Sequence, residues 1–290
     1  MKLATYEYQG KRGVGVVSDD ARSVQPLGLS QAEAEKGVLT LVQQLAAGKP
    51  LPPGEGPAIP LADLRLVAPI PLPRRNIFCV GRNYHEHARE LSASVFKDNN
   101  ANSAVWPIVF TKVPECVVAT GHPVELPGPV SEQIDYEAEL AVVIGKGGRN
   151  ITRDQAMGHV FGYTIVNDVT ARDVQMRHQQ WDLGKSFDTF CPMGPWVVTA
   201  DALDGQSTRV RCWVNGELRQ DASTTDLIFD IPSLIETCSR GITLLPGDII
   251  ATGTPSGVGM GMKPPVFLKA GDTVRIEIDG IGILENGFVQ

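Results

Sequence analysis

Residues 135–145, DYEAELAVVIG, constrain this chain more than any other segment, because acids alternate with apolar residues just ahead of a run typical of a buried strand. Side chains two positions apart in an extended strand point to the same face, about 7 Å from each other. Asp135, Glu137 and Glu139 would therefore share one face. A carboxylate removed from water is destabilising unless positive charge compensates it, and the simplest compensating partner is a hard cation.

The same alternation also describes the solvent-facing side of an edge strand, and periodicity alone leaves both interpretations open. The next residues, 141–144, are apolar on both faces and indicate a strand that is buried on both sides. Acidic residues that lead into a buried strand are destabilising, so their presence favours a functional site.

Length and charge exclude several classes of protein. The chain of 290 residues is long enough for one large domain or two of unequal size. Its net charge of −7 and the absence of a basic run argue against a nucleic-acid partner. The N-terminus lacks the apolar core of a signal peptide, and no apolar run is long enough to span a membrane, so we expect a cytoplasmic protein without a membrane partner.

The five cysteines are scattered without a Cys-x-x-Cys pair, which predicts reduced, buried thiols.

Proline and glycine divide the chain near its first quarter. Before the linker at residues 50–57, PLPPGEGP, we expect a hairpin (3–8 and 14–17, turning at 10–13) and one helix from Ser30 to about Ala47, ended by Gly48. A second proline-rich strip at 66–73 places the boundary near residue 70. We predict a small N-terminal α/β domain over 1–70 and a main, strand-rich domain over 71–290.

The main domain carries several local signals. Asn215 and Gly216 predict a hairpin turn, and Pro232 fits the first turn of a helix over 231–239. The glycine-rich loop at 253–259 offers backbone N–H groups of the kind that bind anions. It matches neither the P-loop nor Gly-x-Gly-x-x-Gly, so it predicts no nucleotide site.

His87 and Glu90 are three apart on a helix expected from Tyr84 onward, so they would lie on one face. A carboxylate that orients an imidazole makes a good general base, although most such pairs belong to ordinary surface helices. His85 and His87 would diverge by about 200° on a helix, which disfavours a metal-binding pair. The polar segment 92–106 that follows is either a lid or a plain surface loop.

A third carboxylate, Asp168, ends the apolar segment 158–168. Together with Glu137 and Glu139 it suits magnesium, manganese or calcium better than zinc. Lys112 ends a strand over 108–112, and Lys185 lies among apolar neighbours; either lysine binds a substrate anion or is simply solvated.

Six motifs in this order resemble the fumarylacetoacetate hydrolase superfamily, in its acylpyruvase and hydroxymuconate isomerase-like branch, over about residues 70–290. They are Gly81-Arg82-Asn83-Tyr84 with His87 and Glu90, the acidic segment 135–140, the segment 167–175 (NDVTARDVQ), Lys185-Ser186-Phe187, residues 214–217 (VNGE), and Gly247-Asp248 through the loop 253–259.

The resemblance implies an α+β fold with a mixed β-sandwich roll, a homodimer, and a divalent metal held by Glu137, Glu139 and Asp168, with Mg²⁺ expected before Mn²⁺ or Ca²⁺. It leaves Asp135 to cap the strand or pair with a basic side chain. It implies that the catalytic groups are His87, Glu90 and Lys185, and that the substrate contacts are Arg82, Tyr84, Lys112, Arg172, Gln175 and Thr254.

The expected activity is metal-dependent hydrolysis of a carbon–carbon bond in an acylpyruvate-type 2,4-dioxo acid, with water activated by the dyad and an enolate stabilised by the metal. Rival activities on the same site are 2-hydroxymuconate-type isomerisation, decarboxylation of a 2-oxo acid, and hydration. A rival from another class is a non-catalytic, metal-dependent binding protein.

Overall fold

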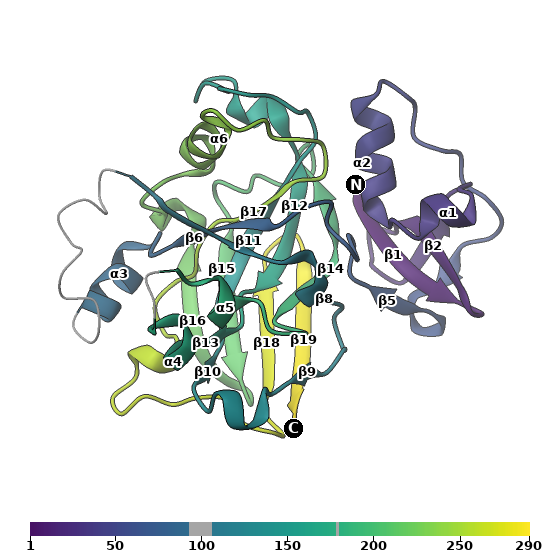
Figure 1. Ribbon diagram of the computed structural model, residues 1–290. Helices are drawn as coiled ribbons and strands as arrows, with labels where there is room; N and C mark the ends of the chain where they lie inside the picture. The colour runs from purple at the N-terminus through teal and green to yellow at the C-terminus, as the bar shows by residue number, and fades with distance from the viewer. Residues whose placement is uncertain (93–105, 178–179) are drawn as a thin grey trace.

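One large mixed sheet organises the chain in the computed structural model, which describes residues 1–92, 106–177 and 180–290 (Figure 1). Its strands follow the order β4-β3-β2-β1-β14-β12-β11-β17-β6-β7, with β5 beside β1 and β8 beside β14. The strands of this sheet are β1 (Lys2–Tyr8), β2 (Lys11–Val17), β3 (Ser23–Pro26), β4 (Ile59–Pro60), β5 (Arg65–Val67), β6 (Ile77–Gly81), β7 (Ile108–Lys112), β8 (Val117–Val118), β11 (Ala138–Ile144), β12 (Val160–Asn167), β14 (Cys191–Thr199) and β17 (Ile249–Ala251).

A second sheet of five strands packs against β11, β12 and β14. Its strands, in the order β16-β15-β18-β19-β9, are β9 (Val124–Glu125), β15 (Arg209–Val214), β16 (Glu217–Ser223), β18 (Thr273–Ile278) and β19 (Gly282–Val289). A short ladder joins β10 (Ile134–Asp135) to β13 (Thr170–Ala171). The result is the predicted α+β fold, a mixed sandwich roll rich in strands.

The helices are few and short. They are α1 (Gln31–Ala34), α2 (Val38–Ala46), α3 (His85–Ser92), α4 (Arg172–Gln175), α5 (Asp182–Lys185) and α6 (Ile231–Ser239). Among the described residues, none is long and apolar enough to cross a membrane.

Two hydrophobic cores cover the two faces of the central sheet. One core lies between the sheets and includes Leu140, Val142 and residues of β15 and β18. The other lies on the opposite face and joins Ala141 and Val143 to α2. Every residue of β11 is buried as a result, which confirms a strand covered on both sides and excludes the edge-strand interpretation.

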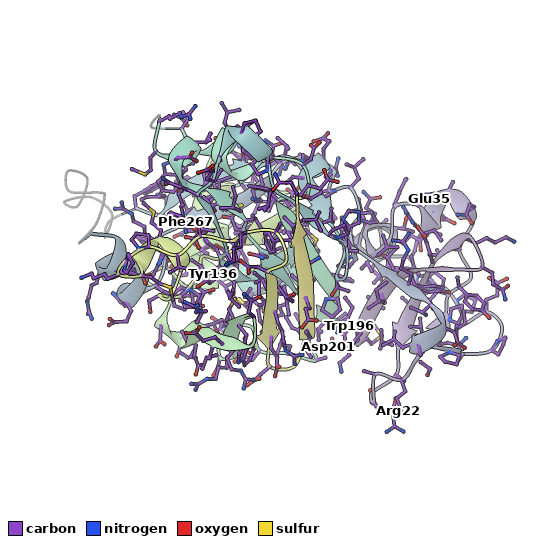
Figure 2. All side chains as sticks on the ribbon, turned by 90° about the horizontal axis from the view of Figure 1, so that it is seen from below. Arg22, Glu35, Tyr136, Trp196, Asp201 and Phe267 are labelled. Carbon is purple, nitrogen blue, oxygen red and sulfur yellow. The ribbon has the colours of Figure 1, made fainter. Side chains whose placement is uncertain are left out.

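The N-terminal part lies beside the rest of the chain and joins its sheet through β1 and β14 (Figure 1). Figure 2 shows the same division from below, with Tyr136 inside the larger body and Glu35 and Arg22 on the N-terminal part. The division near residue 70 remains a prediction, since the first strands continue the central sheet.

Two local predictions are corrected in this part. The hairpin turns at Gln9 and Gly10, both with positive φ (48° and 75°), so β2 begins at Lys11 rather than after the predicted turn. The helix predicted from Ser30 is two helices, because α1 ends at Ala34 and Gly37, with a φ of 64°, is the N-cap of α2. Ser30 does form a capping box with Glu33.

Other predictions from local pattern are confirmed. The hairpin at Asn215–Gly216 joins β15 to β16, and α6 follows its N-cap Asp230 with Pro232 in its first turn. All five cysteines are free and buried. The predicted lid or loop at 92–106 lies almost entirely outside the described residues.

Candidate metal centre and active site

The pairing of β11 with β12 explains why Asp168 joins two acids some thirty residues earlier in the chain. Ala138 is opposite Asn167, and the amide of Asp168 donates to the carbonyl of Glu137 at 2.9 Å. The side chain of Asn167 accepts from the amide of Glu137 at 3.1 Å. Glu137, Glu139 and Asp168 are buried, and one carboxylate oxygen of each lies within 4.8 Å of the others.

Asp135 stands apart from this cluster because the strand is interrupted between β10 and β11. Its carboxylate accepts from Arg172 Nε at 2.9 Å and from the amides of Gly259 at 2.7 Å and Met260 at 3.0 Å. Pairing with a basic side chain was one of the two roles expected for Asp135.

The glycine-rich loop binds anions that belong to the chain itself. Besides the amide of Gly259, the amide of Gly253 donates to Glu139 at 2.8 Å and that of Gly257 donates to Glu90 at 3.0 Å. The loop therefore positions acids of the site.

Two buried lysines hold carboxylates of this cluster. Lys185 Nζ donates to Glu137 at 2.8 Å and to Asp168 at 2.7 Å. Lys112 Nζ lies on the other side of Asp168, at 2.7 Å, and also contacts the carbonyls of Val169 and Lys185. Helix α5 reaches this position because Gly184 lets its backbone approach Gln175, where a Cβ would lie only 2.6 Å from the Gln175 nitrogen.

Glu137 and Glu139 are electrostatically different although both are buried. Burial pushes the pKa of Glu137 upward, but Lys185, Arg172 and His87 together lower that pKa to about 2. Burial raises the pKa of Glu139 well above its ordinary value, and the charges of Asp168 and Glu137 raise it further. Glu139 is therefore the carboxylate of the cluster that most lacks positive charge.

The predicted dyad forms across the first turns of α3. His87 Nδ1 lies 3.1 Å from Glu90 Oε2, and His87 is buried. A neutral His87 that donates its Nδ1–H to Glu90 keeps a lone pair on Nε2, which can accept a proton from a bound molecule.

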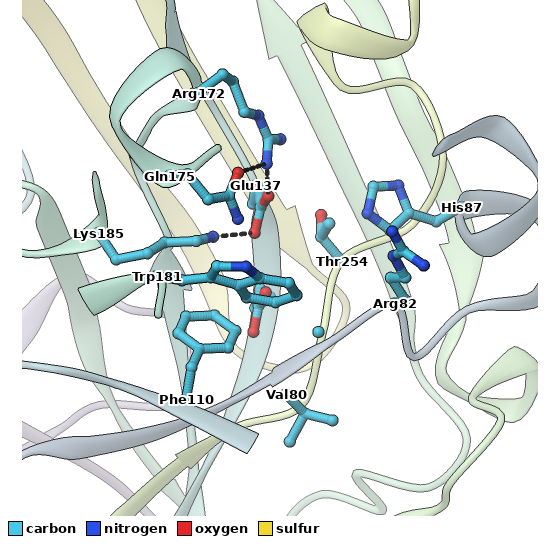
Figure 3. A pocket seen from close by; sticks show the side chains of 12 residues that line it. Val80, Arg82, His87, Phe110, Glu137, Arg172, Gln175, Trp181, Lys185 and Thr254 are labelled. Atoms are coloured by element: carbon cyan, nitrogen blue, oxygen red, sulfur yellow. Dashed lines mark hydrogen bonds and ion pairs between the residues drawn. The ribbon is translucent and has the colours of Figure 1, made fainter. Parts of the chain in front are cut away.

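A pocket brings these groups together (Figure 3). Arg82 and His87 lie on one side of Glu137, and Arg172, Gln175 and Lys185 lie on the other (Figure 3). The predicted site residues that line it are Arg82, His87, Glu137, Glu139, Arg172, Gln175, Lys185 and Thr254.

Four predicted site residues lie outside this lining. Glu90 and Asp168 lie behind His87 and Lys185, which they contact. Lys112, expected to contact substrate, is fully buried behind Asp168 and its ammonium donates to protein oxygens. Tyr84 is buried and pairs through its backbone with Leu227.

Sequence reasoning missed several residues of the pocket. Phe110 and Trp181 form an edge-to-face pair with ring centroids 5.2 Å apart, and Lys185 Nζ lies 4.8 Å from the Phe110 centroid. Both aromatic residues neighbour lysines that the sequence did single out, which is the signal that could have found them. Gln220 lies behind the lining and gave no such signal, yet it donates to Thr254 at 2.8 Å.

The donor set fits a hard divalent cation. Three converging carboxylates supply oxygen ligands only, as Mg²⁺, Mn²⁺ and Ca²⁺ prefer. The raised pKa of Glu139 points the same way, because a cation would supply the positive charge that this carboxylate lacks.

Comparisons with known proteins agree with this geometry. Residues 76–289 match the family model described as fumarylacetoacetate (FAA) hydrolase C-terminal. The chain is 46% identical to a Bacillus subtilis protein named oxaloacetate tautomerase YisK, over 99% of both chains.

Solved structures extend the likeness to the whole fold. A fumarylacetoacetate hydrolase from Exiguobacterium antarcticum matches with a TM-score of 0.86 and 41% identity, covering 100% of this chain and 99% of the other. A maleylpyruvate hydrolase from a Sphingobium species, solved with manganese(II) and pyruvate, matches with a TM-score of 0.77 and 33% identity over 100% and 99% of the two chains. The chain belongs to the fumarylacetoacetate hydrolase family.

Proposed function

We propose that this protein is an oxaloacetate tautomerase, which interconverts the keto and enol forms of a 2-oxo dicarboxylate with the help of a divalent cation. The observation that carries the proposal is the buried carboxylate cluster of Glu137, Glu139 and Asp168, with Lys185 on one side and His87 across the pocket. The likeness to the Bacillus subtilis protein over nearly all of both chains supports oxaloacetate as the substrate.

The cluster would hold Mg²⁺, or alternatively Mn²⁺ or Ca²⁺. When bound, such a cation supplies a Lewis acid that favours negative charge on the oxygen of a 2-oxo acid. Lys185, already fixed by Glu137 and Asp168, adds a second positive charge at the same place.

His87 moves the proton at carbon. Its Nε2 removes a proton from C3, and the C–H electron pair becomes the C2=C3 double bond. The 2-oxo oxygen then takes a proton from solvent to give the enol, and His87 releases the proton from C3 to solvent. Ketonisation is the reverse, with the proton returned to C3, so no atom is gained or lost. Glu90 orients the imidazole and stabilises its protonated form.

Hydrolysis of an acylpyruvate is the second candidate, and the dyad is the observation that favours it. The same His87 and Glu90 pair can deprotonate water for attack on a 4-carbonyl. Tautomerisation uses only the enolate half of that chemistry, so both activities would need the same cluster.

The test compares products. Purified protein with Mg²⁺ is mixed with freshly dissolved enol oxaloacetate, with acetylpyruvate and with a hydroxymuconate, and each is followed by ultraviolet absorbance and NMR. We expect faster loss of the enol signal with oxaloacetate conserved. Cleavage of acetylpyruvate to acetate and pyruvate, with enol oxaloacetate decaying as in buffer, would replace the proposal by hydrolysis.

We also propose a homodimer, as the family resemblance implies. Light scattering of the purified protein should give twice the chain mass, and a monomer at assay concentration would contradict it.

A further inference from the structure

We propose that Arg82 determines substrate specificity by binding the carboxylate at C4 of the substrate, which makes the site selective for 2-oxo dicarboxylates over acylpyruvates that are neutral at that position. This inference rests on the proposed function, because it assigns the second carboxylate of a molecule whose first carboxylate and ketone face the metal cluster.

The position of Arg82 is the first argument. It lines the pocket and is only 8% exposed, and its side chain lies beside that of His87, across the pocket from Lys185 and Arg172 (Figure 3). Its guanidinium therefore faces the half of a ligand that points away from the metal cluster.

The other pocket cations are used on the metal side. The carboxylates of the cluster take their ion pairs from Lys185, Lys112 and Arg172. Arg172 is also bound to Asp135. These cations hold the carboxylates of the cluster, and Lys185 and Arg172 lie across the pocket from Arg82 (Figure 3).

The connectivity of the substrate gives the next step. His87 must reach C3 to move its proton, and the distal carboxylate of a C4 dicarboxylate is bonded directly to C3. Whatever binds that carboxylate must therefore lie next to His87. Arg82 is the pocket-lining cation that does so (Figure 3).

The backbone at Arg82 is built to hold one orientation. Arg82 has a φ of 53°, a left-handed conformation that is disfavoured for a residue with a side chain. The next side chain, that of Asn83, fixes it by donating to the carbonyls of Phe229 at 2.9 Å and Thr252 at 2.7 Å and accepting from the amide of Phe229 at 2.8 Å.

Asn83 also couples Arg82 to the metal cluster through Gly253. A Cβ on Gly253 would lie 2.7 Å from the Cβ of Asn83, and the amide of Gly253 binds Glu139. The spacing between the guanidinium and the cluster is thus set by packed backbone, which suits recognition of a ligand of fixed length.

Burial makes Arg82 a strong anion receptor. Burial lowers the pKa of Arg82, and a carboxylate bound to the guanidinium would stabilise its charged form. The planar guanidinium also matches a carboxylate with two parallel hydrogen bonds.

The test measures binding of two 2-hydroxy acids that differ only in the distal carboxylate, L-malate and L-lactate, by calorimetry of the Mg²⁺-loaded protein. In R82Q we expect malate to bind about 10- to 100-fold more weakly, the range for losing a charged hydrogen-bond partner, while lactate binding stays unchanged. R82K keeps the charge without the planar fork and should retain part of the preference for malate.

R89Q is the matched control, because Arg89 lies on the nearby helix α3, but its side chain is 72% exposed and pairs with Glu86. It should bind both acids as the wild type does. Equal weakening of malate and lactate in R82Q, or no change in either, would overturn the assignment. If R82Q does not fold, R82K decides. An R82K variant that binds malate with the wild-type affinity and the full preference over lactate would also contradict recognition by the guanidinium fork.

Binding and turnover separate this inference from the proposed function. Wild-type protein that prefers malate through Arg82 but does not accelerate tautomerisation of oxaloacetate would leave the Arg82 assignment standing and remove the proposed activity. If the protein instead tautomerises oxaloacetate and its 4-methyl ester with equal kcat/KM, the proposed activity stands. The assignment of Arg82 to the C4 carboxylate is then removed.

Discussion

Asp135 and Glu139 come from the same run of alternating acids, yet they lie in two differently built anion sites. Asp135 accepts hydrogen bonds from Arg172 and from the amides of Tyr136, Gly259 and Met260. Glu139 accepts from the amide of Gly253, and no other described residue forms an ion pair or side-chain hydrogen bond with it.

The comparison teaches how a structural carboxylate differs from one that serves a metal. Protein donors satisfy Asp135 completely, so it closes the entrance to the strand and neutralises Arg172. Burial leaves Glu139 with raised pKa and a single donor, which is costly unless a cation arrives. The following predictions test this difference, beginning with the largest expected effect.

Glu139→Gln should abolish metal-dependent turnover, by about 1000-fold or more, because the cation loses a ligand charge whose Lewis-acid contribution is several kcal/mol. The amide oxygen of glutamine can still accept from Gly253, so the free energy of unfolding of the metal-free protein should stay the same or rise. Enol decay and urea denaturation measure the two quantities. Full activity in this variant with Mg²⁺ would remove Glu139 from the metal site.

Asp135→Asn makes the same chemical change at the closed site and should act on stability instead. Arg172 would keep a buried charge with one partner fewer, which costs about 3–5 kcal/mol. Urea denaturation should show this loss, while Mg²⁺ affinity of the folded protein, measured by calorimetry, remains near that of the wild type. Loss of Mg²⁺ binding with stability unchanged would reverse the roles assigned to the two acids.

His87→Ala should slow turnover by about 100-fold or more, the usual contribution of a positioned acid–base group, without weakening Mg²⁺ binding. His87 lies across the pocket from the carboxylate cluster and is no part of it. Steady-state kinetics at saturating Mg²⁺ measure the loss of turnover, and a metal titration measures Mg²⁺ binding. Undiminished turnover would mean that another base moves the proton.

Mg²⁺ binding should release a proton over the pH range between the ordinary pKa of Glu139 and its raised value. In the metal-free folded protein Glu139 holds its proton above pH 4.5, so the cation must displace it, and affinity rises with pH by up to about tenfold per unit. Calorimetry in buffers of different ionisation enthalpy counts the protons. The number of protons released per Mg²⁺ bound should fall to zero in Glu139→Gln. If protons are still released in this variant, they come from another group.

The two glutamates also predict opposite effects on metal-free stability. The pKa of Glu137 is lowered to about 2, so its stabilisation is present above pH 4.5 and is lost as the pH falls from there towards 2. Glu139 has a raised pKa, so stability is lost as the pH rises above 4.5 towards that value. Denaturation curves across pH, with and without Glu139→Gln, separate the two contributions.

Local pattern was sufficient where a residue's role depends on its neighbours in sequence. The hairpin at Asn215–Gly216 and helix α6 after Asp230 follow from turn and capping chemistry, and the apolar residues 141–144 indicated burial on both faces. The motifs with family resemblance also placed eight predicted residues on the pocket lining.

Tertiary contacts decided the rest. The helix over 30–47 breaks at Gly37 because Pro69 and Thr5 approach it so closely that a Cβ would lie 2.5 Å from an oxygen of each. The strand ending at Lys112 does not reveal that Asp168 and two carbonyls occupy its ammonium. Periodicity likewise grouped Asp135 with Glu137 and Glu139, because it cannot detect the break between β10 and β11.

The most direct test of the central claim is anomalous diffraction from a crystal of the protein grown with Mn²⁺. The predicted result is one strong peak in each chain, bounded by carboxylate oxygens of Glu137, Glu139 and Asp168, with Asp135 still paired to Arg172. A peak on Asp135, or a peak that Asp168 does not reach, would contradict it.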